Sequence, residues 1–112
     1  MRKPIALFLS LALFAVLAAT ALAATKSVTV GDDYFVRSTG VPTVTVRRND
    51  TVRWLFRGDS AHNVVVKKGP VKFNSPVKSS GSYSKRVTRR GTYTIICTIH
   101  GAATQSMKLV VK

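Results

Sequence analysis

From Ser27 to the C-terminus, hydrophobic and polar residues alternate in short segments that are rich in Val, Thr, Tyr and Ile. A period of two is typical of β-strands that bury one face, and no segment of helical length is indicated. Turn-forming Gly, Pro, Asn, Asp and Ser residues separate the segments. The pattern predicts eight strands, over 26–30, 34–37, 43–47, 51–57, 62–67, 82–88, 92–97 and 105–111.

The number and spacing of these strands predict an all-β fold, a Greek-key antiparallel β-sandwich of seven or eight strands. Alternation places Trp54 on the inner face of its strand, where a large aromatic side chain anchors a core. The same alternation turns Cys97 inward at the end of its strand, on the face that carries Tyr93 and Ile95. The segment 67–85, which contains Pro, Ser and Gly, is expected to be a loosely structured connection.

The N-terminal residues have the three parts of a secretory signal peptide. A positively charged start, an apolar run over 5–17 and the small-x-small sequence Ala-Leu-Ala follow one another. Cleavage after Ala23 divides the chain into a signal peptide, 1–23, and one domain, 24–112. We therefore expect an exported protein, periplasmic or extracellular.

One cysteine and two histidines follow the predicted cleavage site. A single thiol cannot form a disulfide within the chain, and in an oxidising compartment it is open to oxidation unless a ligand occupies it. His62, Cys97 and His100 all fall at strand ends, and two residues separate Cys97 from His100. One thiolate with two imidazoles suits a borderline-soft metal ion, and a His2Cys set with a weak axial ligand is the arrangement of a blue copper site.

The motifs around these residues extend over the whole predicted domain. They are VTV at 44–46, NDTVRW at 49–54, HNV at 62–64, GSY at 81–83, GTYTIICTIH at 91–100 and MKLVV at 107–111. Together they resemble the cupredoxins, the type 1 blue copper proteins, and in particular the small plastocyanin-like members. The resemblance implies one type 1 copper ion, with His62, Cys97 and His100 as its ligands. It also implies that Asn63 joins the two ligand-bearing loops through hydrogen bonds, which orients the ligands.

The resemblance leaves the axial ligand open. Plastocyanin-like chains usually carry a methionine five residues after the second ligand histidine, and that position is Gln105 in this chain. If the loop keeps its usual length, Gln105 supplies an axial oxygen, as its counterpart does in stellacyanin-like proteins, and Met107 packs in the core. If the loop is longer, Met107 supplies a thioether and Gln105 lies at the surface. We favour Gln105 as the axial ligand.

A copper site of this kind predicts a single-electron carrier and not an enzyme. The four acidic residues all fall in expected turns, which does not indicate paired-carboxylate catalysis. One alternative is a copper-homeostasis protein without electron transfer, although such proteins tend to carry Met-rich or His-rich clusters. Another alternative is a metal-free surface sandwich in which Cys97 is only a buried residue.

The chain is strongly basic, with 18 Lys and Arg residues against 4 acidic residues and a net charge of +14. The cationic side chains are spread over turns and outward strand positions and form no single block. This charge favours an acidic redox partner, or an anionic membrane or cell-wall surface. Export argues against nucleic acid as a partner, and the domain is expected to be a monomer.

Overall fold

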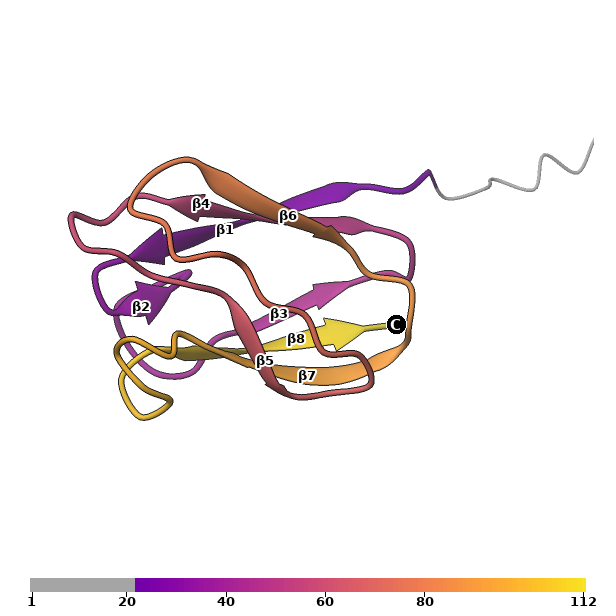
Figure 1. Cartoon of the computed structure of the whole chain (residues 1–112). Helices are drawn as coiled ribbons and strands as arrows, with labels where there is room; N and C mark the ends of the chain where they lie inside the picture. Colours follow the sequence, from indigo (N-terminus) through magenta and orange to yellow (C-terminus); the bar gives the residue numbers. More distant parts are fainter. Residues whose placement is uncertain (1–21) are drawn as a thin grey trace, which may run out of the picture.

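The computed structural model describes residues 22–112, so residues 1–21 of the predicted signal peptide lie outside the described residues. The described chain contains the eight predicted strands (Figure 1). They are β1 (Thr25–Gly31), β2 (Tyr34–Phe35), β3 (Thr43–Val46), β4 (Thr51–Phe56), β5 (Val65–Lys68), β6 (Ser82–Arg86), β7 (Gly91–Ile96) and β8 (Ser106–Val111). Over residues 22–112, the structure contains no helix that is long and apolar enough to cross a membrane.

The strands form two four-stranded sheets that pack as a sandwich, which confirms the predicted fold class. One sheet has the order β2-β1-β4-β6 and the other has the order β3-β8-β7-β5. Most neighbouring strands are antiparallel, but β1 runs parallel to β4 and β3 runs parallel to β8. The sequence pattern did not predict that these two strand pairs are parallel. They arise because β3 crosses to the second sheet before β4 returns beside β1, as in a Greek-key connection.

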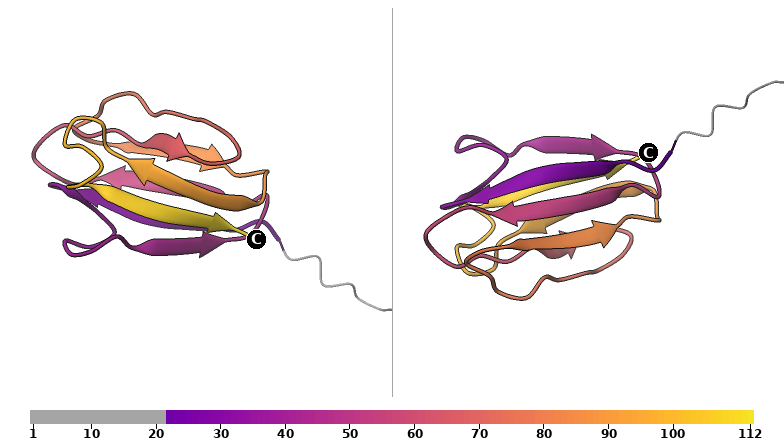
Figure 2. Two further views of the ribbon diagram at one scale, coloured as in Figure 1. Left: turned by 90° about the horizontal axis from the view of Figure 1, so that it is seen from below. Right: turned by 90° about the horizontal axis from the view of Figure 1, so that it is seen from above.

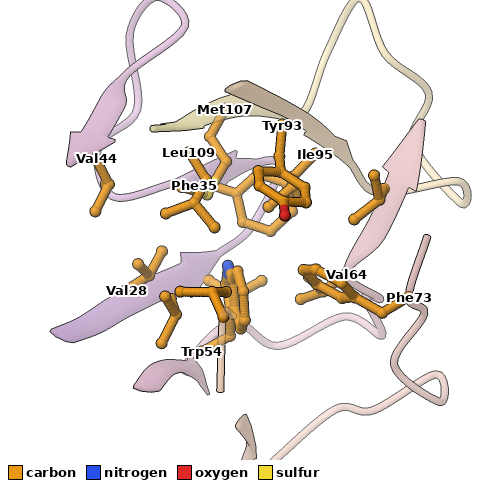
Figure 3. Packing of buried hydrophobic residues seen from close by; sticks show 14 of the residues in the cluster. Val28, Phe35, Val44, Trp54, Val64, Phe73, Tyr93, Ile95, Met107 and Leu109 are labelled. Carbon is orange, nitrogen blue, oxygen red and sulfur yellow. The ribbon is translucent and has the colours of Figure 1, made fainter. Parts of the chain in front are cut away.

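The inner faces of the two sheets build one hydrophobic core. Figure 3 shows Met107 and Leu109 of β8 facing Val28 and Trp54 of the other sheet. Trp54 is fully buried, as its place in the alternating pattern predicted. Alternation along β7 continues into the next residue and buries Cys97, again as predicted.

Two predicted strands are shorter in the structure. The segment 34–37 pairs only at Tyr34 and Phe35, because Val36 adopts a left-handed backbone conformation with φ of 67° that ends the ladder. The strand expected from residue 62 begins at Val65. His62 instead forms an isolated antiparallel bridge with Lys78, in the long connection between β5 and β6.

Most loops lie at the two ends of the sandwich, because the strands run along its long axis (Figure 2). The β5–β6 connection is the exception, since it runs back beside β5 and bridges to Val65 through Asn74 and to His62 through Lys78. One end carries the turns 47–50 and 87–90 together with Lys112, since the register places Thr51 opposite Arg86 and Gly91 opposite Val111. We call it the basic end. The other end carries the β1–β2 turn, the β4–β5 loop and the β7–β8 loop, and we call it the ligand end.

Candidate metal centre

His62, Cys97 and His100 lie together at the ligand end. Their ligand atoms, two imidazole nitrogens and one sulfur, all lie within 4.8 Å of one another. The Sγ atom of Cys97 lies 3.5 Å from Nδ1 of His100 and 4.0 Å from Nδ1 of His62. His62 and Cys97 are fully buried, whereas the side chain of His100 is 23% exposed. The fold therefore brings the three side chains singled out in the sequence to one place.

The β7–β8 loop holds Cys97 and His100 side by side. Cys97 directly follows β7, and its N–H donates to the carbonyl of Gln105 across the base of the loop. The N–H of Gly101 donates to the carbonyl of Cys97, and the carbonyl of Gly101 accepts from the N–H of Gln105. Gly101 has a φ of 85°, a conformation that glycine adopts at no steric cost. This closed loop turns His100 back beside the sulfur.

The β4–β5 loop supplies His62 and is joined to the β7–β8 loop through Asn63. The backbone of His62 exchanges two hydrogen bonds with Lys78, which fixes it without a strand. The side-chain amide of Asn63 donates to Oγ1 of Thr98 at 2.8 Å and accepts from the N–H of Thr98 at 2.9 Å. Two hydrogen bonds thus hold the loop of His62 against the loop of Cys97 and His100.

Gln105 and Met107 occupy different environments. Both are fully buried, and Gln105 points into the site, with its Oε1 atom 2.9 Å from Nδ1 of His62. Its Nε2 group donates to the carbonyls of Tyr34 and Gly31, at 3.0 and 3.3 Å. Only the amide nitrogen can donate to carbonyls, so these contacts turn Oε1 toward the ligand cluster. Met107, by contrast, belongs to the hydrophobic core of β8.

Two residues that were predicted only to form part of a turn also belong to the site. Asp32 and Asp33 lie between β1 and β2, and each places a carboxylate oxygen on the Nε2 atom of one imidazole. The distances are 3.0 Å from Asp32 to His62 and 3.1 Å from Asp33 to His100. An Asp-Asp pair after a strand was the only signal in the sequence, because contacts 30 and 67 residues apart depend on which turns share an end of the sandwich.

The carboxylate of Asp32 determines which nitrogen of His62 faces the cluster. Hydrogen bonds from His62 and from the backbone N–H groups of Asp59 and Ser60 hold the pKa of Asp32 far below its ordinary value. An ionised carboxylate can only accept, so Nε2 of His62 carries the proton that it donates to Asp32. Nδ1, which lies 2.9 Å from Oε1 of Gln105 and 4.0 Å from Sγ of Cys97, is then the ring nitrogen that a metal ion would bind.

Comparison with known proteins agrees with this geometry. Residues 38–112 match the family model described as copper binding proteins, plastocyanin/azurin family. The chain belongs to this family. A comparison with curated protein sequences finds no significant match.

Solved structures similar to this cupredoxin include several of amicyanin. An oxidised amicyanin with methionine replaced by lysine is 28% identical, with a TM-score of 0.65 and coverage of 79% of this chain and 82% of that chain. A Cu(I) amicyanin with methionine replaced by glutamine is 29% identical, with the same TM-score and coverage. A copper-containing nitrite reductase from Thermus scotoductus SA-01 shares the fold at 20% identity and a TM-score of 0.64, and the match covers 22% of that chain.

The ligand cluster of this cupredoxin fits one type 1 copper ion. A buried, free thiol and two imidazoles form the soft and borderline donor set that copper prefers in this geometry. The hydrogen bonds of Asn63 and Asp32, together with the carboxylate of Asp33 beside His100, orient the donors from outside the cluster. The predicted cofactor, copper, is therefore supported by the family and by the chemistry of the site.

Proposed function

We propose that this protein is a single-electron carrier in which His62, Cys97 and His100 hold one copper ion. The observation that carries the proposal is the convergence of one thiol and two imidazoles within 4.8 Å, in side chains that are already oriented by hydrogen bonds. When bound, copper in this donor set supplies a one-electron couple between Cu(I) and Cu(II). The amicyanin relatives support this function, since they include both oxidised and Cu(I) forms.

The protein would hold the copper ion in a rigid ligand set and expose it to a redox partner through one ligand only. Buried His62 and Cys97 exclude water, and the hydrogen bonds between the loops resist rearrangement when the charge of the site changes. His100 alone among the three reaches solvent, and its neighbour Ile99 is 49% exposed. We infer that a redox partner docks beside the ring of His100. This role requires no substrate pocket, so the proposal is a carrier and not an enzyme.

Redox cycling separates a carrier from a copper-homeostasis protein. The Cu(II)-loaded protein is reduced with ascorbate in the presence of a Cu(I)-specific chelator, then reoxidised with ferricyanide. A carrier is expected to bleach and to recover its colour over repeated cycles while it retains its copper. Transfer of the copper to the chelator during the first reduction would instead support a protein that hands on Cu(I).

We further propose that Gln105 is the axial donor and that Met107 is structural. The orientation of the Gln105 amide supports the first part, because its nitrogen is bound to two carbonyls and its oxygen faces His62. The place of Met107 in the core supports the second part. An amide oxygen is a harder donor than a thioether, so it favours Cu(II) and lowers the reduction potential.

We also propose that the protein is exported after removal of 1–23, which leaves the domain 24–112, and that it docks on an anionic lipid surface through its basic end. Seven exposed cationic side chains gather at that end: Lys26, Arg47, Arg48, Arg86, Arg89, Arg90 and Lys112. The single aspartate there, Asp50, is buried and accepts from the N–H groups of Ala24 and Arg47, which keep its pKa below the ordinary value. Docking by this end would leave the ligand end facing a soluble redox partner.

Sedimentation with lipid vesicles tests this orientation. Removal of two charges by Arg89→Gln with Arg90→Gln is expected to weaken binding to phosphatidylglycerol vesicles roughly 30-fold, at about 1 kcal/mol for each cation near the surface. The matched control, Arg53→Gln with Lys108→Gln, removes the same charge from the two outer sheet faces. Equal loss in both variants, or equal binding to neutral phosphatidylcholine, would contradict docking by the basic end.

A further inference from the structure

Carboxylates of one turn lie behind both candidate imidazole ligands, in a hydrogen bond at His62 and at ion-pair distance at His100. Oδ1 of Asp32 lies 3.0 Å from Nε2 of His62, and Oδ1 of Asp33 lies 3.1 Å from Nε2 of His100. In both rings the opposite nitrogen, Nδ1, faces the sulfur of Cys97. The two ring centroids are only 4.7 Å apart, so two adjacent residues can reach both rings.

The backbone of the β1–β2 turn explains how neighbouring side chains serve two rings. Successive residues of an extended chain point to opposite faces. Asp33, however, has a φ of 68°, in the left-handed region that aspartate tolerates better than most residues, and this breaks the alternation. The turn is also fixed in place, because the amide of Gln105 donates to the carbonyls on either side of the pair, those of Gly31 and Tyr34.

Residues of the β4–β5 loop donate hydrogen bonds to the carboxylate of Asp32. Besides His62, this carboxylate accepts from the N–H of Asp59 at 2.8 Å and from the N–H and Oγ of Ser60 at 3.1 and 2.8 Å. A Cβ atom at residue 58 would overlap the carboxylate, so Gly58 is required for this approach. These contacts fix Asp32 although its side chain is 43% exposed.

We propose that Asp32 and Asp33 are positioning residues that set the rotation and tautomer of both imidazoles and raise the electron-donating power of Nδ1 toward Cu(II). This inference rests on the proposed role of His62 and His100 as copper ligands. A carboxylate on the outer nitrogen of a ligand histidine fixes the ring and strengthens the inner nitrogen as a donor. Cu(II) is harder than Cu(I) and gains more from a stronger nitrogen donor, so the pair stabilises the oxidised site.

The test compares Asp32→Asn and Asp33→Asn with Asp59→Asn. Each variant removes one negative charge at the ligand end, but Asp59 contacts Asp32 through its backbone and not through its carboxylate. We expect Asp32→Asn and Asp33→Asn each to lower Cu(II) affinity about 10- to 100-fold, the usual effect of such partners. With Cu(I) affinity unchanged, the potential rises by about 59 mV for each tenfold loss. In the Asp59→Asn variant, the Cu(II) affinity and the reduction potential should both change by only a small fraction of the shifts in the other two variants.

A second readout does not depend on the potential. In the diamagnetic Cu(I)-loaded protein, proton–nitrogen NMR should show both rings as Nε2–H tautomers. The His100 ring signals should shift only in Asp33→Asn, and those of His62 only in Asp32→Asn. Among the hydrogen bonds and ion pairs described for residues 22–112, Asp33 takes part only in the ion-pair contact with His100, so its variant is expected to fold even if Asp32→Asn does not.

The outcomes separate this inference from the proposed function. A wild-type protein that forms no thiolate-to-Cu(II) band would overturn the ligand assignment itself. A wild-type protein with the band, whose Asp33→Asn variant has the potential, the Cu(II) affinity and the ring signals of the Asp59→Asn control, would overturn the positioning role alone.

Discussion

Replacement of Cys97 by serine is expected to abolish the intense visible absorption of the Cu(II)-loaded protein. That band arises from charge transfer from a thiolate to Cu(II), and Cys97 is the one cysteine in the sequence. Serine is close in size to cysteine, so the buried position can be filled without a cavity, but its hydroxyl is a hard and weakly acidic donor. Visible spectra of both proteins after addition of one equivalent of Cu(II) measure the effect.

The matched control for this experiment is Met107→Leu. It removes the other sulfur in the predicted domain, from a core position beside Leu109, and preserves approximate side-chain volume. The colour should remain in this variant. A band that persists in Cys97→Ser would mean that the thiolate assignment is wrong.

Replacement of Gln105 by leucine is expected to raise the reduction potential. The substitution removes the oxygen that lies 2.9 Å from Nδ1 of His62 and leaves no axial donor in its place. Loss of a hard donor weakens Cu(II) binding more than Cu(I) binding, and a tenfold change in that preference corresponds to about 59 mV. We expect a rise of at least roughly this size, measured by redox titration of the visible band.

Met107→Leu again provides the comparison, because it places the same side chain at the other candidate axial position. Its potential should stay near that of the wild type. A large shift in Met107→Leu together with an unchanged potential in Gln105→Leu would transfer the axial role to Met107.

The alternating pattern of hydrophobic and polar residues was sufficient to predict most of the fold. It predicted all eight strands and the burial of Trp54 and Cys97, since a residue's face in a strand follows from local parity. It did not predict that β1 and β4 run parallel, because strand partners are chosen by the packing of distant segments. It also extended a strand through Val36, whose left-handed backbone is not indicated by a β-branched side chain.

The site was only partly accessible from the sequence. A lone cysteine and two histidines at strand ends, together with the cupredoxin motifs, were enough to single out His62, Cys97 and His100. The orientation of Gln105 depends on carbonyls about 70 residues away in the chain, so the sequence left it open. The contacts of Asp32 and Asp33 with the two imidazoles could not be predicted for the same reason, since they form only when three loops share one end of the sandwich.

X-ray absorption at the copper edge tests the central claim most directly, because it counts the atoms bound to the metal. The protein loaded with one equivalent of copper is predicted to show one sulfur and two imidazole nitrogens in the first coordination shell. A shell without sulfur, or with a single imidazole, would contradict the convergence of His62, Cys97 and His100 on one ion.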